Sequence, residues 1–153
     1  MFLMHTLEKR KINCLDMQRV LFLCTGNSAR SQMAEALLKH LGGDGFEVFS
    51  AGTNPKSEVN PFALEALQEK GIPTQGLYPK LVNQFVNNEF DLVVTVCDKA
   101  KQVCPHFPSA KRMEHWSLED PAAFQGTHIE TLFTFRETLE EIEKRIRTSI
   151  LNS

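Results

Sequence analysis

Cys24 and Arg30 are the residues of this sequence whose types and spacing most clearly point to chemistry. A continuous apolar run precedes Cys24 and a helical pattern follows Arg30, so the residues between them connect a strand to a helix. Backbone N–H groups at such a helix start have no partner within the helix and can converge on a tetrahedral oxyanion. Gly26 and Asn27 suit the tight backbone turn that this geometry requires. The sequence therefore predicts an anion-binding loop.

Cys24 is predicted to lie at the floor of this loop as a nucleophile. The loop amides and the helix start favour a thiolate there, and Arg30 can hold two oxygens of the anion in a fork. A lone cysteine on an apolar strand is more often a small buried residue, but the strand before the loop and the helix after it favour the nucleophile. The residues predicted to bind the oxyanion are Thr25, Gly26, Asn27, Ser28, Ala29, Arg30 and Ser31.

Length and composition predict one globular domain. The chain has 153 residues, 42% of them hydrophobic, and a net charge of −2, and its charges show no pattern that favours a nucleic acid or an anionic membrane. No apolar run is long enough to cross a bilayer, so we expect a cytoplasmic protein whose four cysteines are thiols. A monomer is the default expectation, since the sequence does not fix the oligomeric state. Residues 1–18 are polar without a clear period, and we interpret them as a loosely ordered extension of a domain at 19–153.

Apolar runs that alternate with helical patterns predict an α/β fold, in which a four-stranded parallel sheet carries helices on both faces. The expected strands lie at 20–23, 46–50, 90–96 and 111–116, and the expected helices at 31–41, 62–70, 80–86 and 127–150. Leu81 is expected on the apolar face of the third helix and Ile129 on that of the fourth. Ligands in such folds bind at the carboxyl ends of the strands, where Cys24, Cys97 and the loop after Trp116 are expected.

Two further cysteines, Cys97 and Cys104, follow the third expected strand and lie seven residues apart. On their own, these residues are equally well explained as a buried thiol and a residue at a helix end. A zinc site with His106 and His115 is disfavoured, because zinc sites usually contain a closer cysteine pair. Asp120 lies in the loop after Trp116, and Asp120-Pro121 is a common turn sequence whose carboxyl can also serve as a general acid.

The sequence from Arg19 onward resembles the low-molecular-weight phosphotyrosine phosphatase superfamily and, within it, the thioredoxin-coupled arsenate reductases. Both branches share the phosphate loop, from Cys24 to Ser31. Three features are similar to the reductases in particular: Gln32-Met33-Ala34-Glu35 where phosphatases typically have Pro after the serine, the pair Cys97 and Cys104, and the segment from Glu114-His115-Trp116 to Asp120-Pro121-Ala122. The resemblance therefore implies an arsenate reductase with the phosphatase fold.

The same resemblance implies a mechanism. Cys24 attacks arsenate held by the loop and Arg30, and Asp120 supplies the proton as general acid. Cys97 then attacks the Cys24 sulfur, and Cys104 takes over the disulfide. The electrons come from an external dithiol, for which the resemblance implies thioredoxin, with glutaredoxin as an alternative, and no bound cofactor is expected.

Two other functions remain open from the residues alone. A phosphotyrosine or small-ester phosphatase needs only Cys24, Arg30 and Asp120, and weak phosphatase activity can accompany a reductase because the loop and the acid are shared. A non-catalytic oxyanion-binding or redox-sensing module needs only the loop. The role of Cys97 and Cys104 separates the first of these from the reductase.

The resemblance also bears on metal binding. Some reductases of this group bind potassium near the phosphate loop, and Asn27, Glu35 and Ser50 match three of its ligands. The fourth ligand is a carboxylate in those proteins, whereas Lys80 occupies the corresponding position here. An ammonium group at this position can take the place of the cation. We therefore predict supporting roles for these four residues and no bound metal.

Overall fold

The computed structural model describes residues 17–97, 107–108 and 110–152. Its strands are β1 (Gln18–Cys24), β2 (Phe46–Gly52), β3 (Phe90–Thr95) and β4 (Ala110–His115), and its α-helices are α2 (Arg30–Gly42), α3 (Pro61–Glu69) and α5 (His128–Ile146). Shorter helical turns are η1 (Gly43–Gly45), η2 (Val82–Phe85), η3 (Pro121–Ala123) and the π-helical η4 (Arg147–Leu151). Among these residues, no helix combines the length and the apolar character needed to cross a membrane.

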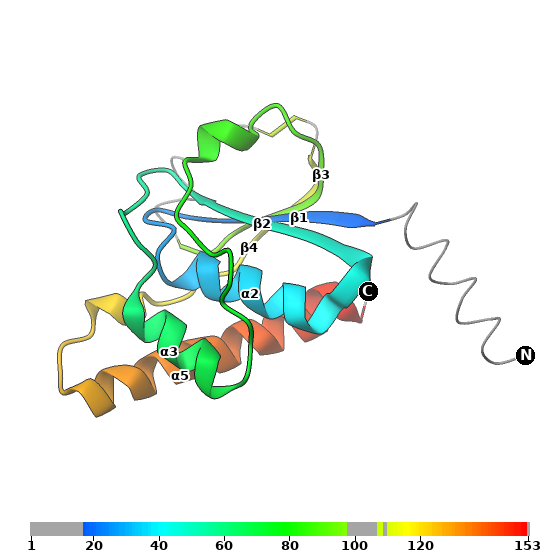
Figure 1. Cartoon of the computed structure of the whole chain (residues 1–153). Coiled ribbons are helices and arrows are strands. Elements are labelled where there is room, and N and C mark those ends of the chain that lie inside the picture. Colours follow the sequence, from blue (N-terminus) through cyan, green and yellow to red (C-terminus); the bar gives the residue numbers. More distant parts are fainter. Residues whose placement is uncertain (1–16, 98–106, 109, 153) are drawn as a thin grey trace, which may run out of the picture.

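The four strands form one parallel sheet in the order β2-β1-β3-β4 (Figure 1). Strand β1 lies in the interior of the sheet, and its apolar run is buried on both sides, as expected for a parallel strand. The register pairs Cys24 with Gly52, so the loop that follows β1 begins against the end of β2. The predicted four-stranded parallel sheet is confirmed.

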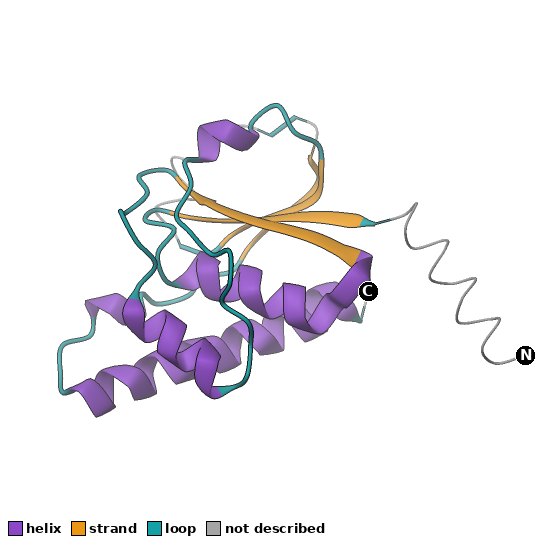
Figure 2. Cartoon of the chain, in the orientation of Figure 1, coloured by secondary structure: helices purple, strands orange, loops and turns teal. Residues whose placement is uncertain are grey.

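Side chains alternate between the two faces of the sheet, and each face has its own core. Val20 and Phe22 of β1 pack into the larger cluster, which also contains the buried residues of α2, α3 and α5. Leu21 and Leu23 pack into a second cluster with η2. Figure 2 shows the three α-helices together on one side of the sheet and η2 on the other. Helices therefore cover both faces as predicted, with the longer ones all on one face.

The helix expected at 80–86 is shorter than predicted. It is the single 3-10 turn η2, and Leu81 before it is extended and 40% exposed. Leu81 forms an isolated parallel bridge with Gly52, and the Gly52 N–H donates to the Lys80 carbonyl at 2.8 Å. This edge pairing with the end of β2 extends the backbone at Lys80 and Leu81, so the helical pattern of the sequence is overridden there.

The last helix begins as predicted at Thr127, whose side chain and Glu130 form a reciprocal capping box. The α-helical part ends at Ile146 and continues as η4. Ile129 is 76% exposed, so its expected place on the buried face is wrong. The buried face begins one turn later, because the first turn of α5 extends beyond the sheet; its members are Thr131, Leu132, Phe135, Leu139, Ile142 and Ile146.

Strand β1 begins at Gln18, one residue before the predicted domain boundary. The Arg19 N–H donates to Asp91 Oδ2 at 2.7 Å, which fixes this end of the strand against β3. Residues 1–16 lie outside the described residues, so the loose order of the N-terminal extension stays a prediction.

We expect Gly52→Ala to destabilise the protein. A Cβ at this position would lie 2.5 Å from the Thr25 carbonyl oxygen and 2.9 Å from Asn27 Cβ, because the loop after β1 approaches β2 closely there. Overpacking of this kind costs about 1–3 kcal/mol. Urea denaturation measures the loss. Gly45→Ala is the matched control, since a Cβ there meets nothing within 4 Å, and equal stability of the two variants would contradict the close approach.

Candidate active site

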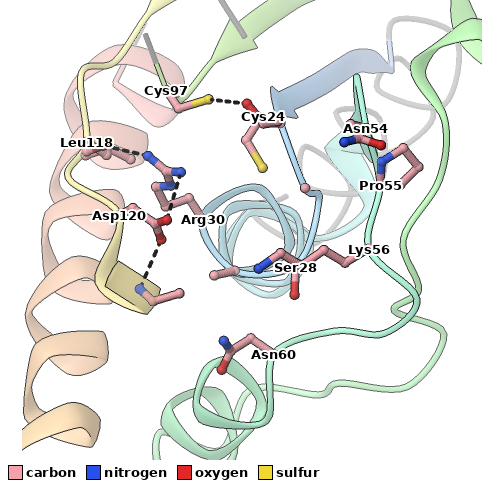
Figure 3. Close-up of a pocket in the computed structure, with 14 residues that line it drawn as sticks. Cys24, Ser28, Arg30, Asn54, Pro55, Lys56, Asn60, Cys97, Leu118 and Asp120 are labelled. Carbon is pink, nitrogen blue, oxygen red and sulfur yellow. Dashed lines mark hydrogen bonds and ion pairs between the residues drawn. The ribbon is translucent and has the colours of Figure 1, made fainter. Parts of the chain in front are cut away.

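A cavity of about 560 Å³ opens at the carboxyl ends of β1 and β3 (Figure 3). Four segments surround it: the phosphate loop, the segment 54–60, the end of β3 and the loop after β4. The lining residues are Cys24, Thr25, Gly26, Ser28, Ala29, Arg30, Asn54, Pro55, Lys56, Asn60, Cys97, Leu118, Asp120 and Ala122. The structure therefore brings the predicted nucleophile, arginine, second cysteine and acid to one cavity.

Most carbonyl groups of the phosphate loop are held on its outer side by backbone amides. The pairs are Cys24 O with Thr53 N–H at 3.2 Å, and Thr25 O with Asn54, Gly26 O with Lys56, Ser28 O with Asn60 and Ala29 O with Met33, each at 2.9 Å. The C=O and the following N–H of a trans peptide point in opposite directions. Outward carbonyls therefore turn the loop N–H groups inward, which is the arrangement that binds a tetrahedral oxyanion.

Cys24 occupies the centre of this loop, and Figure 3 shows its sulfur inside the cavity. The Asn27 N–H donates to Cys24 Sγ at 3.2 Å, and Ser31 Oγ lies 2.9 Å from the same sulfur. Asn27 Nδ2 donates to Ser31 Oγ at 2.8 Å, which leaves the serine hydroxyl hydrogen free to point at the sulfur. Hydrogen-bond donors directed at a sulfur provide the environment that a nucleophilic thiolate needs.

Arg30 connects the phosphate loop to the loop after β4. Its Nη1 donates to the Leu118 carbonyl at 2.9 Å, and its Nη2 lies 3.7 Å from Asp120 Oδ2. Asp120 also accepts the Ala122 N–H at 3.0 Å and thereby caps η3. The guanidinium and the η3 cap together hold the carboxyl of Asp120 at the mouth of the cavity, where a general acid is needed.

Cys97 follows β3 and is buried beside the phosphate loop. Its Sγ lies 3.4 Å from Thr25 Oγ1, and both residues line the cavity (Figure 3). Cys104 lies outside the described residues, so its predicted role stays a prediction. The alternative zinc site falls partly on the same segment, and among the described residues no group of three or more His, Cys, Asp and Glu side chains could hold a metal.

A buried polar network lies behind the phosphate loop, around Asn27. The backbone of Asn27 is left-handed, with φ of 46°, and its side chain donates to Ser50 Oγ at 2.9 Å. Asn27 Oδ1 accepts the Lys80 N–H at 2.8 Å, and the Ser50 hydroxyl donates to Glu35 Oε1 at 2.6 Å. All four predicted supporting residues are therefore connected, and their contacts fix the left-handed residue of the loop.

The Lys80 ammonium takes part in the same network. It donates to the Tyr78 carbonyl at 2.7 Å and lies 3.7 Å from Glu35 Oε1, while the other Glu35 oxygen pairs with Lys39 at 2.5 Å. Burial lowers the pKa of Lys80 from its ordinary value, and the Glu35 carboxylate opposes this shift. Because an ammonium group already lies against the buried carboxylate, these residues do not fit an additional potassium ion.

Three polar lining residues were not predicted from the sequence as site residues: Asn54, Lys56 and Asn60. Asn60 was expected only as a helix cap, and its side chain does accept the Phe62 N–H at 2.8 Å. The Asn60 N–H also donates to the Ser28 carbonyl at 2.9 Å. The side chain of Lys56 lies over Gly26. The position of Lys56 in the turn that follows β2 was the one signal in the sequence that could have indicated its place at the site.

The model of the low molecular weight phosphotyrosine protein phosphatase family matches residues 19–151. The chain belongs to this family. Its resemblance to the phosphatase superfamily, inferred from the sequence, is thereby confirmed, and the matched residues include the loop from Cys24 to Arg30.

Similar proteins within this family include arsenate reductases. One from Halalkalibacterium halodurans is 45% identical over 129 residues, which cover 84% of this chain and 92% of that protein. A solved structure of an arsenate reductase in the phosphate binding state aligns with a TM-score of 0.76 at 31% identity, over 89% of this chain and 98% of the other. A thioredoxin-dependent arsenate reductase from Corynebacterium glutamicum aligns with a TM-score of 0.63 at 32% identity, over 93% and 72% of the two chains.

Arg30→Lys is expected to weaken phosphate binding about tenfold or more. Lysine carries a point charge and cannot reproduce a two-pronged contact to an oxyanion, and a hydrogen bond to a charged group contributes about 1.5–3 kcal/mol. Isothermal calorimetry with inorganic phosphate measures the change. Arg147→Lys, on the surface of η4, is the control. Equal phosphate affinity of both variants and the wild type would mean that Arg30 only anchors the loop after β4.

We expect thermal stability to respond alike to sodium and potassium at matched ionic strength. The Lys80 ammonium lies beside Glu35, where a bound cation would have to compete with it. Melting curves across a concentration series of the two chlorides test this expectation. A saturable stabilisation by potassium alone would show that a cation displaces the ammonium.

Proposed function

We propose that this chain is an arsenate reductase, which converts arsenate to arsenite through an adduct on Cys24 and a disulfide cascade over Cys24, Cys97 and Cys104. The observation that carries the proposal is the second thiol in the cavity. Cys97 Sγ lies 3.4 Å from Thr25 Oγ1 of the phosphate loop. Hydrolysis of a phosphate ester needs one nucleophile and an acid, whereas reduction of arsenic(V) needs two electrons, which a pair of thiols can supply.

The relatives support the same choice. Arsenate reductases are among the proteins 39–45% identical to this chain, and one solved relative is described in a phosphate binding state. Phosphate and arsenate are both tetrahedral oxyanions, so a loop that binds one offers the same inward amides to the other.

In the first step, Cys24 Sγ attacks arsenic while the inward amides and Arg30 hold the oxygens. A sulfur–arsenic bond forms and an arsenic–oxygen bond breaks. The leaving oxygen takes the proton of Asp120, whose carboxyl lies at the mouth of the cavity, and departs as water. The amides also stabilise the charge on the remaining oxygens as the bonds change.

In the second step, the Cys97 thiolate attacks Cys24 Sγ. A disulfide bond forms between the two cysteines, the sulfur–arsenic bond breaks, and its electron pair stays on arsenic. Arsenic(V) thereby becomes arsenic(III), and two thiols have been oxidised to one disulfide. The product leaves as arsenite.

In the third step, Cys104 attacks Cys97 and returns Cys24 to its reduced form. The disulfide is then carried by Cys97 and Cys104, from which an external dithiol recovers both thiols. Thioredoxin is the proposed donor, because one similar reductase is described as thioredoxin-dependent. Glutaredoxin is the alternative, and the cycle uses no bound cofactor.

A phosphotyrosine phosphatase is the second candidate, because Cys24, Arg30 and Asp120 share the cavity. The described lining residues fit this substrate less well. None of them is aromatic, and the walls beside the loop consist of Asn54, Pro55, Lys56, Leu118 and Ala122. A bound aromatic ring is stabilised by apolar burial and by contacts with other rings. The cavity is therefore better suited to a free oxyanion.

Single-turnover reduction distinguishes the two candidates. Cys104→Ser is expected to release arsenite once and then to stop with a Cys24–Cys97 disulfide, because the transfer outward needs the third thiol. Cys97→Ser is expected to release little arsenite, because the first exchange is blocked. The measurement is arsenite yield per chain, with the disulfides mapped by mass spectrometry.

Cys14→Ser is the control for these variants, since Cys14 has no step in the mechanism. Phosphatase activity, where present, should survive all three substitutions, because ester hydrolysis uses only Cys24, Arg30 and Asp120. If Cys97→Ser and Cys104→Ser both cycle like the wild type, the reductase proposal is wrong and the phosphatase takes its place.

A further inference from the structure

Asn27 is the exception among the carbonyls of the phosphate loop. The other carbonyls from Cys24 to Ala29 accept from backbone amides, whereas Asn27 O accepts from a side chain, the Nε2 of Gln32, at 3.0 Å. Gln32 lies in the first turn of α2, directly after the loop. The mechanism above does not use it.

We propose that Gln32 is a positioning residue that orients the Ser28 N–H toward the bound oxyanion. The Asn27 C=O and the Ser28 N–H belong to one trans peptide and point in opposite directions. Holding the carbonyl outward therefore turns the amide inward. Asn27 is left-handed, with φ of 46°, a strained conformation for a residue with a side chain. The hydrogen bond from Gln32 fixes the orientation of the peptide that follows this residue.

The burial of Gln32 supports a specific role for its amide group. Its side chain is fully buried, and its Oε1 has no hydrogen-bond partner among the described residues. A buried acceptor without a donor is costly, typically about 1–3 kcal/mol. An apolar side chain would avoid this cost. In return, the NH₂ group of Gln32 donates two hydrogen bonds, and an apolar side chain would donate none.

The second hydrogen bond of Gln32 connects the phosphate loop to a segment that is distant in the sequence. Gln32 Nε2 also donates to the Tyr78 carbonyl at 2.9 Å, and the Lys80 ammonium donates to the same oxygen at 2.7 Å. Two carbonyl oxygens on one side require the NH₂ end of the amide there, which leaves Oε1 on the other side. Gln32 thus connects the left-handed turn of the loop to the segment that carries Lys80.

The inference rests on the proposed function in one respect, which is that the loop binds a tetrahedral oxyanion. Sulfate is the probe, because it stays a dianion across the pH range of the test. All variants carry Cys24→Ser, so that ionisation of the thiol does not contribute. In this background, calorimetry compares the parent with Gln32→Met, Gln32→Glu and the exposed control Gln68→Glu.

Gln32→Met is expected to bind sulfate about tenfold more weakly than the parent at any pH, which corresponds to one hydrogen bond to a charged group. Gln32→Glu is expected to bind as weakly at about pH 8, where a carboxylate cannot donate to the Asn27 carbonyl. It is expected to recover most of the affinity at about pH 5, because burial at this position raises the pKa of the carboxyl and the protonated acid donates one hydrogen bond. Gln68→Glu should match the parent at both values. Affinities are expressed relative to the parent at the same pH, because the charged groups that face the cavity, Arg30, Lys56 and Asp120, are the same in all variants.

If Gln32 acts through packing alone, Gln32→Glu will bind sulfate weakly at both pH values, without recovery at low pH. This result would overturn the inference. Equal sulfate affinity of the parent and both Gln32 variants would also overturn it, while the proposed function would stand. A parent that binds no sulfate would contradict oxyanion binding by the loop and, with it, both proposals. A carboxylate at position 32 that pairs with the Lys80 ammonium still leaves the Asn27 carbonyl without a donor, so the expected loss of affinity at about pH 8 is unchanged.

Discussion

The rest of this site depends on one constraint, which is that the carbonyl groups of the phosphate loop accept hydrogen bonds from groups on its outer side. Short loops favour no single peptide orientation, and each inward N–H here exists because the carbonyl before it has a partner outside. Most of those partners are amides of residues 53–60, which follow β2, so the parallel pairing of β1 with β2 sets the distance at which the loop is held. Gly52 allows the two segments to approach closely. The sheet thus shapes the oxyanion site without contributing a side chain to it beyond Cys24.

A second layer of buried charge keeps this geometry fixed. Glu35 is almost fully buried, and each of its oxygens lies near an ammonium group, from Lys39 on one side and from Lys80 on the other. Buried charges remain stable only when they are paired and hydrogen-bonded in this way. Ser50 and Asn27 carry the contact from Glu35 to the loop. The phosphate loop is therefore held rigid by the buried ion pairs and hydrogen bonds behind it, while the side that binds the oxyanion stays open.

The sequence predicted the parts of this structure that depend on local pattern. The alternation of strands and helices, the loop from Cys24 to Arg30 and the cap at Asn60 all follow from neighbouring residues. Contacts between distant segments were harder to predict: Gln32 meets Tyr78 across 46 positions, and no local pattern indicates that contact. Ile129 was placed on the buried face because periodicity gives the face of a helix, but not where the helix extends beyond the sheet. Lys80 was predicted beside Glu35 from the family resemblance, and the backbone pairing of Leu81 was missed.

The central claim is that the chain itself supplies the two electrons that reduce arsenic(V). The most direct test mixes fully reduced wild-type protein with excess arsenate in the absence of any external reductant. Arsenite is then quantified by chromatography and free thiols by titration. The account predicts one arsenite per chain and the loss of two of the four thiols. Arsenate binding without arsenite release, with all four thiols retained, would contradict it.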